Sequence, residues 1–120
     1  MKNLTLEKLG NSVATLQKVM ADDTAVSNDY SYDNVFERKI EVLGQAGDVF
    51  LGISTSGNSK NVLKALQLSR KLGISTIGFS GRDGGKMTPL RDYNAIVPSE
   101  TTANIQESHL ALEHIFCRLV

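Results

Sequence analysis

Four hydroxyl side chains follow a short apolar run in the middle of the chain, and they are well suited to binding an anion. Val49 to Ile53 is an almost unbroken apolar run, and Ser54, Thr55, Ser56 and Ser59 follow it. The run predicts a strand buried on both faces of a parallel sheet, and the small residues after it predict a tight loop before a helix. Hydroxyl donors beside the N–H groups and positive dipole of a helix N-terminus favour a phosphate monoester. The alternative is a serine-rich turn that satisfies only its own backbone.

The last segment, residues 102–120, holds a second group of polar side chains and both histidines. Its apolar residues recur at helical spacing and predict a helix that is buried on more than one side. The polar members are Gln106, Glu107, His109, Glu113 and His114. Glu113 follows His109 by four residues, so the two share a face, but spacing alone favours a solvated stripe over a metal site. Cys117, the only cysteine, lies in the apolar run and is predicted to be a core residue rather than a nucleophile.

The elements that must position these groups alternate between strands and helices. We expect helices over residues 4–20, from about Asp33 to residue 43, from Asn58 or Ser59 to Gly73, and over 102–120, with strands at 49–53, 74–80 and 95–97. A strand, helix, strand order with such a crossover implies parallel neighbours and a right-handed connection. Residues 81–86 should form a flexible loop, with a short helical turn at Pro89. The spacing of glycines in that loop matches neither nucleotide-binding fingerprint.

Length and composition limit the classes of function. A chain of 120 residues predicts one domain, and 13 basic and 13 acidic residues give a net charge of zero. This balance does not favour nucleic acid or a membrane surface as a partner. No apolar run approaches the roughly 18 residues of a spanning helix, and the first residues do not resemble a secretory signal peptide. We therefore expect a cytoplasmic protein.

Several motifs together resemble the sugar isomerase (SIS) domain family, and above all its phosphoheptose isomerase branch. They are Gly47-Asp48-Val49, Ser54-Thr55-Ser56-Gly57-Asn58-Ser59, Gly84-Gly85-Lys86-Met87, Ile105-Gln106-Glu107-x-His109 with His114, and Asn28-Asp29-Tyr30-Ser31-Tyr32. The resemblance covers residues 24–120 almost continuously. It implies a three-layer α/β sandwich with a parallel sheet, an N-terminal helix that packs in an oligomer, and a homotetramer with active sites between subunits.

The resemblance also implies a reaction and a set of site residues. The reaction is isomerisation of D-sedoheptulose 7-phosphate to D-glycero-D-manno-heptose 7-phosphate, for ADP-heptose and lipopolysaccharide core synthesis. By position, the phosphate ligands would be Ser54, Thr55, Ser56 and Ser59. Gln106 and His114 match zinc ligands of the family, and His114 also matches one of its two proton-transfer residues.

One departure from the family concerns the junction around residues 20–24. Residues 1–20 match the first helix and residues 24–120 match the second half of a single SIS domain, but the strand, glycine-rich loop and His-x-x-x-Glu helix expected between them are missing. That segment would supply the other zinc ligands, a second proton-transfer group and part of the phosphate pocket. We therefore expect the intact protein to contain more than these 120 residues, and a non-catalytic SIS module that binds a sugar phosphate is the alternative function.

Overall fold

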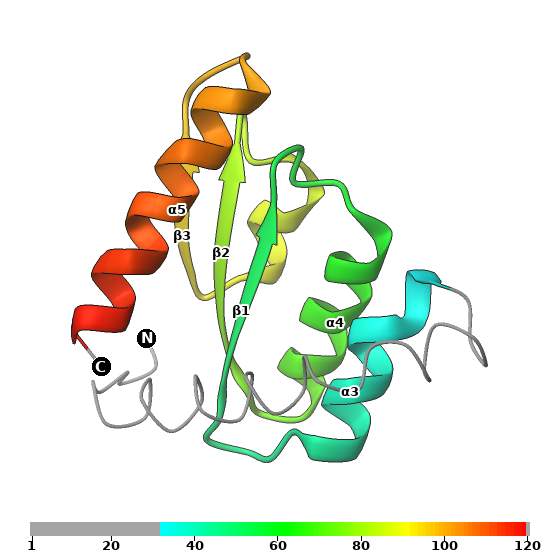
Figure 1. The fold of residues 1–120 in the computed structure, drawn as a ribbon. Coiled ribbons are helices and arrows are strands. Elements are labelled where there is room, and N and C mark those ends of the chain that lie inside the picture. Colours follow the sequence, from blue (N-terminus) through cyan, green and yellow to red (C-terminus); the bar gives the residue numbers. More distant parts are fainter. Residues whose placement is uncertain (1–31, 120) are drawn as a thin grey trace.

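A parallel sheet between two layers of helices organises the chain (Figure 1). The computed structural model describes residues 32–119. The sheet has the order β1-β2-β3, and the elements in sequence are η1 (Tyr32–Asn34), α3 (Val35–Leu43), β1 (Val49–Ser54), α4 (Lys60–Lys71), β2 (Ser75–Gly81), η2 (Gly85–Leu90), β3 (Tyr93–Val97) and α5 (Thr102–Leu119). Helices α3 and α4 cover one face and α5 covers the other. The predicted three-layer α/β fold is confirmed, while the helix predicted over residues 4–20 lies outside the described residues.

The strand register brings the two loops of interest to the same edge of the sheet. β1 and β2 are parallel and pair from Val49 with Ser75 to Ser54 with Ser80, and β2 and β3 are also parallel. Because the carboxyl ends of parallel strands meet at one edge, the loop after β1 lies beside the loop after β2. β3 begins two residues earlier than predicted because Tyr93 and Asn94 already pair with β2.

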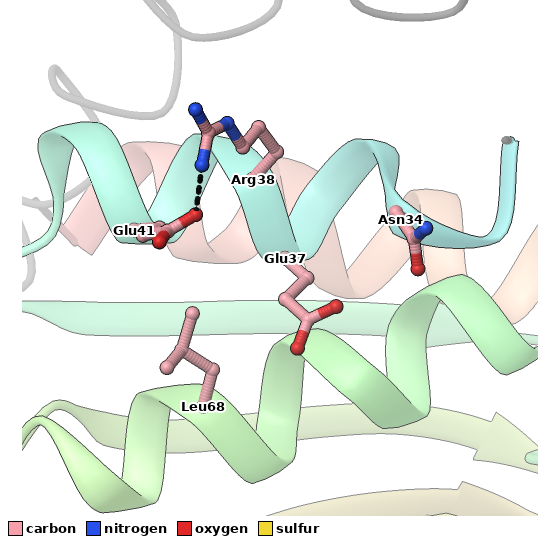
Figure 2. A pocket seen from close by; sticks show the side chains of 5 residues that line it. All are labelled: Asn34, Glu37, Arg38, Glu41 and Leu68. Carbon is pink, nitrogen blue, oxygen red and sulfur yellow. Dashed lines mark hydrogen bonds and ion pairs between the residues drawn. The ribbon is translucent and has the colours of Figure 1, made fainter. Parts of the chain in front are cut away.

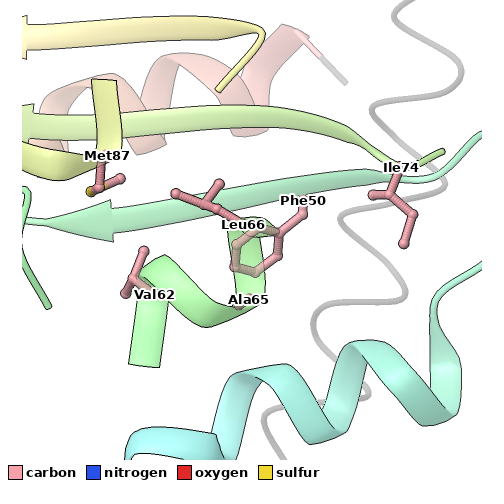
Figure 3. Packing of buried hydrophobic residues seen from close by; sticks show 6 residues of the cluster. All are labelled: Phe50, Val62, Ala65, Leu66, Ile74 and Met87. Atoms are coloured by element: carbon pink, nitrogen blue, oxygen red, sulfur yellow. The ribbon is translucent and has the colours of Figure 1, made fainter. Parts of the chain in front are cut away.

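Each face of the sheet has its own apolar core. Between the sheet and α4 lie Phe50, Val62, Ala65, Leu66, Ile74 and Met87, which Figure 3 shows from close by. On the other face, Val49, Ile77 and Phe79 are packed by partly buried residues that include Leu112 and Phe116 of α5. The rings of Phe79 and Phe116 meet edge to face, with centroids 5.6 Å apart. These two cores fix the sheet between its helices and thereby hold its carboxyl edge in place.

One part of the strand prediction is wrong, because Ile53 is exposed rather than buried. β1 is an edge strand of the described sheet, and α5 packs chiefly on β2 and β3. The α5 side of β1 therefore becomes less covered toward its carboxyl end, where Leu51 is half-buried and Ile53 open.

Helix α5 is buried along one side only, which corrects two predictions. Ile105 and His109 are buried, but the described apolar residues Leu110, Ile115 and Leu119 are exposed. Cys117 is also exposed, so its predicted place in the core is wrong. The sheet offers α5 a single face, and within residues 32–119 nothing packs closely enough on these side chains to bury them. No helix of this described part is both long and apolar enough to cross a membrane.

The core between the sheet and α4 gives a direct test of the fold. Leu66 is fully buried, and its replacement by Ala should lower the free energy of unfolding by about 2–5 kcal/mol, because the truncated side chain leaves a cavity. Val42→Ala is the control, since Val42 on α3 is 68% exposed and should change stability little. Urea unfolding of both variants measures the difference, and equal losses would contradict this packing.

Candidate functional site

The loop between β1 and α4 is closed by hydrogen bonds among its own residues. Gly57 donates its backbone N–H to the carbonyl of Ser54 at 3.0 Å and has a φ of +69°. The hydroxyls of Ser54 and Ser59 lie 2.7 Å apart and bond to each other across the loop. The Ser56 hydroxyl accepts the N–H of Asn58 at 3.1 Å. These hydrogen bonds hold the loop in a closed conformation.

The predicted hydroxyl residues differ in how far they are exposed. Ser54 is buried at 4% exposure, whereas Thr55, Ser56 and Ser59 are half-buried. Each hydroxyl can donate one hydrogen bond and accept two, so the bonds inside the loop leave further bonding capacity. Ser54 is the buried base of the loop and bonds to Ser59, whereas Thr55, Ser56 and Ser59 are partly open to solvent.

The start of α4 favours an anion above this loop. Ser59 is the N-cap, yet its side chain makes no capping hydrogen bond, because its hydroxyl bonds to Ser54 instead. The side chain of Asn61 accepts the N–H of Val62, and the described structure gives the N–H of Lys60 no side-chain cap. Uncapped amides at a helix N-terminus carry partial positive charge. An anion seated on the loop would satisfy them.

The loop after β2 packs directly against the first loop, and it is shorter than the predicted 81–86, because Gly81 belongs to β2 and Gly85 and Lys86 belong to η2. The Asn58 side-chain oxygen accepts the N–H of Lys86 at 2.9 Å, and the Gly57 carbonyl accepts the N–H of Met87 at 3.0 Å. Gly84 and Gly85 both have positive φ, which allows their backbone to approach this closely. Helix η2, which contains Pro89 as predicted, begins at this contact.

The polar residues of α5 do not form one cluster. Gln106, Glu107 and His114 are exposed, while His109 is buried and its Nε2 lies 2.9 Å from the Ser80 carbonyl. His109 also packs on the ring of Phe79, with centroids 5.9 Å apart. The solvated stripe that spacing favoured therefore holds for the exposed members and fails for His109. That histidine ties α5 to the end of β2.

The residues described here do not complete a zinc site. A structural or catalytic zinc ion takes three or four protein ligands, mostly histidine, cysteine or carboxylate. Among residues 32–119 no group of three or more such side chains could hold a metal ion. Gln106 and His114 lie eight residues apart on α5, about 12 Å of helix rise. These two residues alone therefore do not complete a zinc site.

Sequence reasoning did not find three residues that build the site. Asn58 joins the two loops, and Ser80 and Arg91 lie buried beneath them. Asn58 stands inside the Ser54–Ser59 motif, where its residue type predicts a helix cap and not a contact with a second loop. Ser80 and Arg91 carry no local sequence signal, because their contacts join residues 11 positions apart.

A hollow of about 320 Å³ between α3 and α4 is a less suitable anion site (Figure 2). It is lined by Asn34, Glu37, Arg38, Glu41 and Leu68. Arg38 and Glu41 form an exposed ion pair at 2.5 Å, and Glu37 adds a second carboxylate. Two carboxylates against one paired arginine repel a phosphate group. The hollow therefore does not compete with the loop.

The fold and the loop define a class of protein. The family profile described as "SIS domain" matches residues 4–81, and the chain belongs to that family. It is 54% identical over 97 residues to the phosphoheptose isomerase of Sulfurimonas denitrificans, covering 81% of this chain and 50% of that protein. It is 52% identical over 112 residues to the phosphoheptose isomerase of Helicobacter pylori strain Shi470, covering 93% and 58%.

Solved structures show the same likeness. The phosphoheptose isomerase GmhA from Neisseria gonorrhoeae superposes with a TM-score of 0.76 at 44% identity, covering 82% of this chain and 55% of that one. A phosphoheptose isomerase from Francisella tularensis gives a TM-score of 0.75 at 34% identity, covering 92% and 56%. The chain thus spans about half the length of these relatives.

The contact between the two loops predicts an unequal effect of two glycine substitutions. Gly57 and Gly47 both have positive φ, so Ala at either position costs on the order of 1–3 kcal/mol in backbone strain. A Cβ at Gly57 would also lie 2.1 Å from the Gly84 carbonyl oxygen, whereas one at Gly47 meets nothing within 4 Å. We expect Gly57→Ala to be clearly less stable in urea than Gly47→Ala. Equal stabilities would show that the loops do not touch.

Proposed function

We propose that the protein converts D-sedoheptulose 7-phosphate to D-glycero-D-manno-heptose 7-phosphate, a step toward ADP-heptose and lipopolysaccharide core. The observation that carries this proposal is the closed hydroxyl loop at an uncapped helix N-terminus, in a chain more than 50% identical to proteins named phosphoheptose isomerase. The loop would bind the substrate phosphate through Thr55, Ser56, Ser59 and the first amides of α4, with Ser54 as its buried support.

An anchored phosphate would hold the sugar while a proton moves between adjacent carbons through an enediol. This chemistry needs an acid and a base close to the two carbons. His114 is exposed on α5 and is our candidate for one of these groups. A glutamate of the family segment absent between residues 20 and 24 would supply the other. The full reaction therefore requires groups beyond those that residues 32–119 provide.

Zinc remains a proposal that rests on the family resemblance. Gln106 and His114 would be two of its ligands, and the remaining ligands would come from the family segment absent near residues 20–24. A zinc ion would polarise the oxygens of the substrate. Within the described chain, Gln106 and His114 lie open to solvent, so ligands from outside this part could reach them.

We also propose a homotetramer in the cytoplasm. Leu110, Ile115 and Leu119 expose large apolar side chains on α5, and Ile115 and Leu119, four residues apart, share a face. Apolar side chains left open along one helix are typical of a surface that another protein chain covers. A tetramer with sites between subunits would also bring His114 of one subunit near groups that its own subunit does not offer.

A non-catalytic SIS module that binds a sugar phosphate is the second candidate. The same loop supports it, and the chain lacks the second proton-transfer group. The names of the relatives favour the isomerase. Assay of sedoheptulose 7-phosphate isomerisation by the intact protein separates the two functions, because only the enzyme forms an aldose product.

The loop hydroxyls predict the behaviour of a double variant. Ser54→Ala with Ser59→Ala removes the hydrogen bond across the loop and one accessible donor, so the affinity for sedoheptulose 7-phosphate should fall about tenfold or more. Isothermal titration calorimetry measures the change. Ser108→Ala is a control, because its hydroxyl donates to the Asn104 carbonyl on α5, away from the loop. Unchanged affinity in the double variant would remove the loop from the binding site.

His114 predicts a loss of turnover without a loss of folding. In the intact protein, His114→Ala should reduce kcat by about 10² to 10⁴ and weaken zinc binding, because a positioned proton-transfer group contributes that much. Arg118→Ala, also exposed and one turn further on, is the control. His109→Ala is a poor control, since His109 is buried and its loss would disturb packing. Near-normal turnover of His114→Ala, or strong activity of the 120-residue chain alone, would contradict the assignment.

A further inference from the structure

Arg91 is a buried arginine that has no acidic partner among the described residues. Its side chain is 6% exposed and lies between β2 and η2. It donates from Nη1 to the Ser80 hydroxyl at 2.9 Å and from Nη2 to the Thr88 hydroxyl at 3.1 Å. Its Nε is buried and has no hydrogen-bond partner. A buried cation that contacts only neutral oxygens is costly unless an opposite charge comes near.

The backbone around Arg91 leaves room for this arrangement. A Cβ at Gly78 of β2 would lie 2.2 Å from the Arg91 Cδ, so only glycine lets the side chain cross the strand there. A Cβ at Gly84 would lie 3.1 Å from Nη2. The guanidinium therefore reaches the turn at Gly84 and Gly85, which also contacts Gly57 in the loop between β1 and α4 (the anion loop). Gly78 and Gly84 thus leave space for the guanidinium, and the hydroxyls of Ser80 and Thr88 accept its hydrogen bonds.

A short path joins Arg91 to the floor of the anion loop. Ser80, which Arg91 holds, is the register partner of Ser54 on the neighbouring strand. Side chains at paired positions of parallel strands point to the same face, and neighbouring strands lie about 4.8 Å apart. Ser54 in turn bonds to Ser59 at the start of α4. The guanidinium therefore lies one strand away from the loop floor.

The anion loop has no positively charged side chain of its own, so a buried cation nearby would favour anion binding. Residues 54–59 carry no charged side chain, and the nearby Lys60 and Lys86 are exposed and screened by solvent. A buried charge acts over a longer range because the medium around it is less polar. Burial lowers the pKa of Arg91 from its ordinary value, yet arginine remains charged at neutral pH.

We propose that Arg91 is a positioning residue of the anion site, which holds Ser80 beneath the loop and supplies the buried positive charge that the loop lacks. This inference rests on the proposed function, because it assigns the phosphate group to the loop. Arg91 would not touch the phosphate. Its effect would appear in phosphate affinity and in KM, with little change in kcat.

Three substitutions of Arg91 separate its charge from its hydrogen bonds. Arg91→Lys keeps the charge, Arg91→Gln keeps a donor for Ser80 without the charge, and Arg91→Met keeps neither. Arg70→Met is the matched control, since Arg70 also contacts η2, through the Pro89 carbonyl, but is exposed. Titration of the full chain with inorganic phosphate, followed by ³¹P NMR, gives the dissociation constants. Thermal melting identifies any variant that does not fold.

We expect Arg91→Gln and Arg91→Met to bind phosphate about tenfold more weakly, and Arg91→Lys and Arg70→Met to stay within about threefold of the parent. In the intact enzyme, Arg91→Gln should raise KM for sedoheptulose 7-phosphate and leave kcat nearly unchanged. A folded Arg91→Gln that binds as tightly as the parent would overturn the role of Arg91, and so would an Arg91→Lys as weak as Arg91→Gln. If the parent itself binds no phosphate, the anion loop and this role both fail.

Discussion

The contact between the loop after β1 and the loop after β2 is the constraint on which the site depends. Asn58 and Gly57 accept backbone N–H groups from Lys86 and Met87, and the glycines on both sides allow the backbones to meet. Without this contact, the hydroxyl loop would be a surface turn at the end of an edge strand. With it, the two parallel strands hold the hydroxyl residues of the loop at the positive end of α4.

The sequence predicted the local elements of this arrangement but not how they meet. The apolar run of β1, the hydroxyl loop and the helix after it follow from periodicity and residue type, and so does the parallel sheet. The docking of residues 84–87 was missed because glycine-rich segments look flexible until a partner surface is known. The buried Arg91 was missed because its contacts lie across the sheet. Exposed Cys117 was misjudged because apolar spacing does not tell which side of a helix is covered.

The same limits apply to the catalytic groups. His109 and His114 look alike in sequence, yet one joins α5 to the Ser80 carbonyl and the other faces solvent. The loop between β1 and α4 lies entirely within residues 32–119, whereas only some of the proton-transfer and zinc groups expected from the resemblance do. The chain spans about half the length of these relatives, and the phosphate-binding role of its hydroxyl loop is our proposal.

The central claim is that the substrate phosphate binds at the loop between β1 and α4. Titration of ¹⁵N-labelled protein with sedoheptulose 7-phosphate, followed by amide chemical shifts, tests it most directly. The account predicts saturable shifts of the amides of Thr55 to Asn61, with smaller shifts at Gly84 to Lys86. Shifts confined to the hollow between α3 and α4, near Glu37 and Glu41, or no saturable shifts at all, would contradict it.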